Sequence, residues 1–193
     1  NNTYFNKFNL QGAVSEYNHS ERTGSGNNHN INFFSDLYEI KTSLNHNSII
    51  DVNSQGLIGF HFQNYDQGAL GQEESHLVHT RTSSFALFAL ESFNFDLFDL
   101  DVGGRVESVN LKNTSMEKGF FPGAFSSTIK REIFTNNTVF GGFDFTERAP
   151  NAVELFANGP HHALEQFEVG DSNVDVETSY NFSLGYSYND GFD

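Results

Sequence analysis

The sequence predicts an all-β protein in which antiparallel strands follow one another up and down. The first observation is a period of two in side-chain polarity, which is typical of strands with two different faces. The second is that many alternating segments exceed the roughly 5–6 residues usual in soluble sheets. The third is a regular alternation of long and short connections. Together these observations favour an antiparallel up-and-down transmembrane β-barrel.

The clearest strand lies near the end of the chain, in the segment YNFSLGYSY. Its even positions, from Tyr180 to Tyr188, are aromatic or apolar, whereas the odd positions between them are Asn, Ser or Gly. Seven other segments show the same alternation, and no amphipathic helix of normal length is expected. The eight expected strands lie near residues 4–18, 31–44, 51–65, 79–95, 98–111, 123–131, 138–147 and 175–189.

The connections between these strands differ in length in a regular way. Those expected at 45–50, 96–97 and 132–137 are short, and those expected at 19–30, 66–78, 112–122 and 148–174 are long. In an up-and-down meander, every second connection lies at the same end of the sheet. The sorting therefore predicts an outer-membrane barrel with short periplasmic turns and long extracellular loops.

Composition excludes several classes of function. The formal net charge of −15 argues against a nucleic-acid partner, because phosphate binding needs a basic surface. The chain has no cysteine, so disulfides and thiolate chemistry are excluded. The sequence contains no G-x-S-x-G, H-E-x-x-H or P-loop motif, so no enzymatic activity is expected. With 22 Phe and 7 Tyr but no Trp, the aromatic belts at the two membrane interfaces would consist of Phe and Tyr.

A longer pattern resembles a known family. The segment RAPNAVELFANGPHHALEQFEVGDSNVDVETSYNFSLGYSY is similar to a stretch of TonB-dependent outer-membrane receptors that reads roughly R-A-P-x-x-x-E-L-[YF]-x-x-G. The form ELFANGPH looks most like the branch of these receptors that is associated with zinc uptake. Where the family usually has Pro before the Glu that enters the next strand, this chain has Val176. The matching residues are Arg148, Ala149, Pro150, Glu154, Leu155, Phe156, Gly159, Gly170, Asn173, Glu177, Thr178 and Gly185.

The resemblance implies a larger protein. Receptors of this family have a barrel of about 22 strands, so residues 1–193 would form about eight strands of one barrel domain. The plug domain and the energy-coupling segment that precede the barrel in the family are not found in this sequence. The implied function is energy-coupled uptake of a scarce metal ion or metal complex, with zinc favoured. The implied location is the outer membrane of a Gram-negative bacterium, and the implied partners are lipid and the TonB complex, reached through the N-terminal region.

Histidines gather in the long loops and suggest how a metal would be captured. Imidazole and carboxylate are ligands that suit Zn²⁺. No bound cofactor is expected, and Zn²⁺ is a candidate as the transported ligand. A turn at residues 158–160 is expected to present two histidines toward the barrel mouth, with Glu165 and Glu168 nearby. The candidate ligands are His161, His162, Glu154, His76, His79 and Glu73.

One alternative remains open at this point, a soluble β-sandwich or an adhesin-type binding module. Such a protein would also show alternating strands, and its acidic loops would bind Ca²⁺.

For the zinc hypothesis, binding is expected to weaken as the pH falls through the ordinary His pKa of about 6.5.

Overall fold

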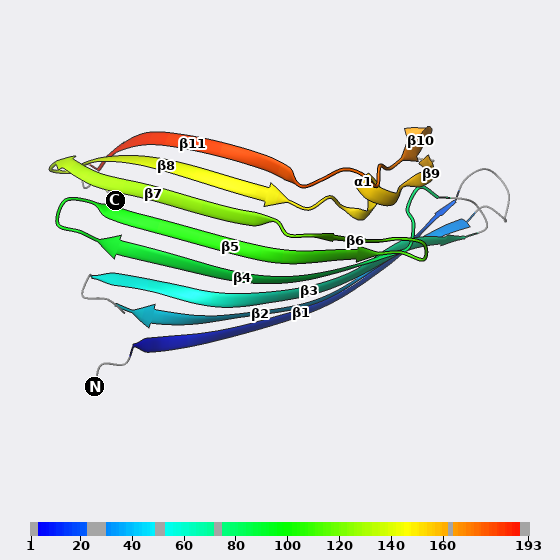
Figure 1. Ribbon diagram of the computed structural model, residues 1–193, viewed down its shortest axis with the longest axis horizontal. Coiled ribbons are helices and arrows are strands. Elements are labelled where there is room, and N and C mark those ends of the chain that lie inside the picture. The colour runs from blue at the N-terminus through cyan, green and yellow to red at the C-terminus, as the bar shows by residue number, and fades with distance from the viewer. Residues whose placement is uncertain (1–3, 23–29, 49–52, 72–74, 162–163, 190–193) are drawn as a thin grey trace.

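The computed structural model describes residues 4–22, 30–48, 53–71, 75–161 and 164–189. Most of these residues form one curved antiparallel sheet with the strand order β1-β2-β3-β4-β5-β7-β8-β11 (Figure 1). Strands β1 and β11 are its two edges. The bounds are β1 Phe5–Arg22, β2 Asn30–Asn47, β3 Ser54–Gly71, β4 Thr80–Asn94, β5 Asp99–Lys112, β7 Gly123–Phe134, β8 Asn137–Arg148 and β11 Glu177–Tyr188.

These eight strands confirm the predicted all-β meander, but several of them are longer than expected. Residues 19–22 and 67–71, which were expected in loops, continue β1 and β3. The register is unbroken from Leu44 paired with Ile58 to Ile31 paired with Gly71. The alternation of apolar and polar residues ends before the hydrogen-bonded ladder does, so the sequence pattern underestimates the strand length. The alternative of a soluble β-sandwich is wrong for the described residues, because the long strands form one sheet and not two packed sheets.

The sheet has one apolar face and one polar face. On β11, Phe182 and Leu184 lie on the apolar face and are 78% and 89% exposed. Phe182 is paired in register with Phe143 of β8, and the two rings are 5.0 Å apart. The other strands continue this face with exposed side chains that include Phe8, Leu10, Val14, Tyr38, Ile40, Ile58, Phe62, Phe85, Leu87, Val106, Phe125 and Ile129.

The polar face carries charged and hydrogen-bonded side chains. The Nε2 atom of His61 on β3 lies 3.0 Å from a carboxylate oxygen of Glu39 on β2. An Nη2–H group of Arg105 on β5 reaches the other ring nitrogen of His61 at 3.3 Å. Asn181 on β11 donates to Asp144 on β8 at 3.2 Å. The two faces therefore suit two different surroundings, one apolar and one aqueous.

The connections are sorted by length as predicted. The strand ends joined by the three short ones, 48–53, 95–98 and 135–136, lie at one end of the sheet, and those joined by the long ones lie at the other end (Figure 1). At the tightest turn, Asn136 has a φ of 66°, a left-handed conformation that Asn tolerates better than most residues. The strand ends that the four long connections join thus share one end of the sheet, which we call the loop end.

Four small elements at the loop end were not predicted. They are β6 Glu117–Phe120, α1 Ala152–Phe156, β9 Asn158–His161 and β10 Gln166–Val169. The prediction of a turn at residues 158–160 is wrong, because these residues are a strand that pairs with β10. Among the described residues, no helix is long and apolar enough to cross a membrane.

Candidate metal site at the loop end of the sheet

A short helix, α1, fixes the start of the longest connection. Its N-cap is Asn151, whose side-chain oxygen accepts the backbone N–H groups of Val153 and Glu154, each at 2.9 Å. The Glu154 carboxylate accepts the backbone N–H of Asn151 at 2.7 Å, which completes a capping box. Both ends of this local exchange are satisfied within four residues, so the helix begins at a defined position.

The buried side of α1 packs against the polar face of the sheet, at the loop end of β5. Leu155, which is 1% exposed, and Phe156 form one hydrophobic cluster with Val109 and Leu111 of β5. Val78, which precedes β4, packs against the same cluster. The helix therefore ties the connection between β8 and β11 to β5 and to the segment between β3 and β4.

The helix leads directly into the hairpin formed by β9 and β10. The carbonyl of Pro160 accepts the N–H of His76 at 3.2 Å, and the carbonyl of His76 accepts the N–H of Asn158 at 3.3 Å. A Cβ atom at Gly159 would lie 2.5 Å from the carbonyl oxygen of Ser75, so only glycine allows the two backbones to approach this closely. His76 thus pairs with β9 through two backbone hydrogen bonds, although residues 75–76 do not form a regular strand.

This pairing brings together His76, His161 and Glu168. The Nδ1 atom of His161 lies 2.7 Å from one carboxylate oxygen of Glu168, and the Nε2 atom of His76 lies 4.0 Å from the other. The two imidazole rings are stacked, with centroids 4.2 Å apart and planes inclined by 19°. One ligand atom from each of the three residues falls within a group spanning at most 4.8 Å.

Two imidazoles and one carboxylate are a ligand set that zinc accepts, with three protein ligands and a fourth position left for water or cargo. All three side chains are half-buried. The hydrogen bond from His161 lowers the pKa of Glu168 below its usual value, which favours the ionised carboxylate that binds a cation.

Two of the predicted ligands lie elsewhere at the loop end. The Nε2 atom of His79 lies 2.7 Å from Asp66, and the same carboxylate accepts Arg81 at 2.9 Å. Glu154 is held by Arg148 and by the capping box. The two other candidates, His162 and Glu73, lie outside the described residues, as do any contacts they make.

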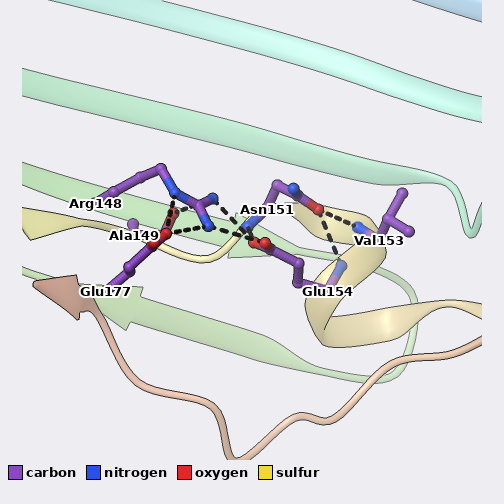
Figure 2. Close-up of polar contacts among 6 residues, drawn as sticks. All are labelled: Arg148, Ala149, Asn151, Val153, Glu154 and Glu177. Carbon is purple, nitrogen blue, oxygen red and sulfur yellow. Dashed lines mark hydrogen bonds and ion pairs between the residues drawn. The ribbon is translucent and has the colours of Figure 1, made fainter.

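Arg148 occupies the junction between β8 and α1 (Figure 2). It donates from Nη1 and Nη2 to the two carboxylate oxygens of Glu154, at 3.0 and 2.9 Å. It donates from Nε and Nη2 to one oxygen of Glu177 on β11, at 2.9 and 2.7 Å. Arg148 thus pairs with two acids at the loop end of the sheet.

We expect the ion pair between Arg148 and Glu154 to weaken at acidic pH. Hydrogen bonds from Arg148, and then from the Asn151 backbone, lower the pKa of Glu154 below its ordinary value of 4.5. The folded-state pKa is therefore lower than the unfolded one, so the stabilisation is complete above pH 4.5 and is lost as the pH falls through the lowered value. Hydrogen exchange should show falling protection of the amides of Ala157 and Asp171 over this range.

The matched control for this pH experiment is Glu154→Gln, which keeps a capping-box side chain but has no carboxyl group to titrate. In this variant the protection of the same amides should change less with pH. An equal pH dependence in both proteins would show that another group is responsible.

A comparison with protein families identifies the barrel. The family model described as TonB dependent receptor-like, beta-barrel, matches residues 1–193. The chain belongs to this family. Its members are outer-membrane receptors of Gram-negative bacteria. In a TonB-dependent receptor barrel the apolar face of the sheet meets lipid, and the polar face, with α1 on it, meets the lumen.

Sequence reasoning missed part of this receptor barrel's loop end. The zinc candidates included His76 and His161, while Glu168 was not among the six and was expected near them, where it could orient or join the ligands. The signal for α1 was present in the N-cap Asn151 and in the Glu three positions later, which is a capping-box spacing. No signal in the sequence indicates that residues 75–76 pair with β9, because that contact joins two distant connections.

Proposed function

We propose that this receptor barrel is part of an outer-membrane transporter that takes up a metal ion, with zinc as the favoured ion. Uptake would be driven by the TonB complex, acting through a region of the receptor outside this chain. The proposal is transport because the chain belongs to the TonB-dependent receptor barrel family. The resemblance of the ELFANGPH segment to the zinc-uptake branch supports the same ion.

The observation that carries this proposal is the convergence of His76, His161 and Glu168. His76 lies in the connection between β3 and β4, whereas His161 and Glu168 lie in the connection between β8 and β11. The backbone pairing of His76 with Pro160 holds the two connections together. Nitrogen ligands favour Zn²⁺ over Ca²⁺ or Mg²⁺, which prefer oxygen. The cluster lies at the loop end, which faces the medium in an outer-membrane barrel.

The test is zinc binding by the full-length receptor carrying His76→Ala and His161→Ala together. Isothermal titration calorimetry should show zinc affinity at this site falling by more than about 100-fold, beyond the loss expected when only an outer-shell partner is removed. Growth under zinc limitation should fall in parallel. Binding to the unaltered receptor should weaken in acid, because an imidazole must be neutral to bind a metal.

The matched control is His79→Ala, which removes an imidazole from the same connection. His79 pairs with Asp66 and is not part of the three-residue cluster, so zinc affinity should stay close to that of the unaltered receptor. Wild-type affinity and growth in the double variant would show that the cluster is not a metal site. A loss confined to His79→Ala would place the site at Asp66.

A further inference from the structure

Arg148 stands out at the loop end because it joins three elements through one guanidinium group. It is the last residue of β8, it lies opposite Glu177 of β11 in the register, and it reaches Glu154 of α1 (Figure 2). Glu154 is engaged on both sides, since it also accepts the backbone N–H of Asn151. A planar guanidinium with parallel hydrogen bonds to a carboxylate fixes orientation as well as distance.

The orientation of α1 determines where His161 and Glu168 lie, because the hairpin that carries them is attached to α1. Ala157 ends the helix, and β9 begins at the next residue and carries His161. After β10, the N–H of Gly170 donates to the Ala157 carbonyl at 2.7 Å, and the N–H of Asp171 donates to the Glu154 carbonyl at 2.8 Å. The hairpin therefore starts and ends on α1.

Close packing at Gly170 makes this attachment stiff. A Cβ atom at Gly170 would lie 2.7 Å from the backbone of Leu155 and Phe156. A rotation of α1 about its buried side would consequently carry the whole hairpin, and with it His161 and Glu168. His76 is tied to this hairpin by backbone hydrogen bonds with Asn158 and Pro160, but its own segment runs from β3 to β4, so a rotation of the hairpin would strain that pairing.

We propose that Arg148 is a positioning residue for the metal site, and that its pairing with Glu154 and Glu177 sets the distance of His161 and Glu168 from His76. This inference rests on the proposed metal-uptake function. Arg148 touches none of the three ligands among its described contacts, so its effect passes through α1 and the hairpin. Its side chain is 50% exposed, and exposed ion pairs contribute little to overall stability. The role is therefore geometric.

The test compares Arg148→Gln with Arg148→Lys and Glu154→Gln in the full-length receptor. Arg148→Gln removes the positive charge and the paired N–H donors of the guanidinium group. Zinc affinity should therefore fall by about tenfold, as for other residues that orient metal ligands. Arg148→Lys keeps the positive charge but lacks the planar pair of N–H donors, so its loss of zinc affinity should be smaller than that of Arg148→Gln. Glu154→Gln keeps the helix cap and should resemble Arg148→Gln. The matched control is Arg131→Gln, which removes an exposed arginine from β7 near the other end.

Two further readouts separate positioning from general damage. The visible spectrum of bound Co²⁺ reports coordination geometry and should change in Arg148→Gln but not in Arg131→Gln. Spin labels on Val169→Cys and Leu97→Cys, in the cysteine-free chain, should show a broader distance distribution in Arg148→Gln without metal. Heat-dependent electrophoretic mobility confirms that each barrel is folded.

Each outcome decides the inference. Weaker zinc binding together with a broader distance distribution supports it. Wild-type affinity overturns it, and so does weaker affinity with an unchanged distance distribution, since Arg148 would then act through charge alone. Failure of the metal function itself would appear separately, as wild-type zinc affinity in the variant that lacks both His76 and His161.

Discussion

Replacement of Phe182 by Arg is expected to destabilise the membrane-inserted barrel by about 2–4 kcal/mol, the cost of a cation near the bilayer midplane on the lipid face of a β-barrel. Phe182 lies on the apolar face of β11, between Tyr180 and Leu184. Its ring also contacts that of Phe143, and this contact would be lost. Urea unfolding of the full-length receptor in lipid vesicles measures the change in the free energy of unfolding.

The adjacent residue provides the matched control. Asn181→Arg places the same side chain on the polar face of the same strand, next to Asp144, to which Asn181 already donates a hydrogen bond. The free energy of unfolding should change by less than about 1 kcal/mol, as for an ion pair in an aqueous setting. If Asn181→Arg is the more damaging change, the lipid and lumen faces are assigned the wrong way round.

Replacement of Leu155 by Ala is expected to cost the loop end about 2–5 kcal/mol, the usual range for removing a buried Leu side chain. Leu155 is 1% exposed and packs in the cluster with Val109 and Leu111. The loss should be local, because α1 covers only one end of the sheet. Hydrogen exchange should show a lower free energy of opening for the amides of Gly170 and Asp171.

Val153→Ala is the control for this change, since Val153 lies on the same helix but is only partly buried. Its effect on the same amides should be clearly smaller. A uniform loss of protection along β8 and β11 in Leu155→Ala would show that α1 supports the whole sheet. Unchanged protection would mean that α1 is not anchored by its buried side.

The strands could be predicted because each strand carries its own evidence. In β11, for example, the alternation of Tyr180, Phe182 and Leu184 with small polar residues is visible within a few positions. The sorting of the connections then fixed the up-and-down order. The ends of β1 and β3 could not be placed, because the ladder continues where the alternation is lost, over polar residues in β1 and over Gly68 and Ala69 in β3.

The candidate site could be predicted only in part, because its geometry depends on contacts between distant segments. His76 and His161 were candidates by residue type and location. Their meeting requires Gly159 to approach Ser75, which no local pattern encodes. The helix that carries the hairpin is short, so Leu155 and Phe156 give no repeating apolar period, and the sequence pattern predicted only a long connection at 148–174.

The difference in strand length shapes the loop end, which is the expected entrance of the barrel. Strands β1, β2 and β3 have 18 residues each, whereas β7, β8 and β11 have 12. At about 3.4 Å per residue, the difference corresponds to about 20 Å of additional strand. At the loop end, β1, β2 and β3 therefore extend beyond β7, β8 and β11. Helix α1 and its hairpin lie at the loop end beyond β8 (Figure 1). A long hydrogen-bonded ladder resists local unfolding better than a small folded loop does. The entrance is therefore bordered in one part by long paired strands and in another by a small folded loop, and His76 and His161 meet where the two join.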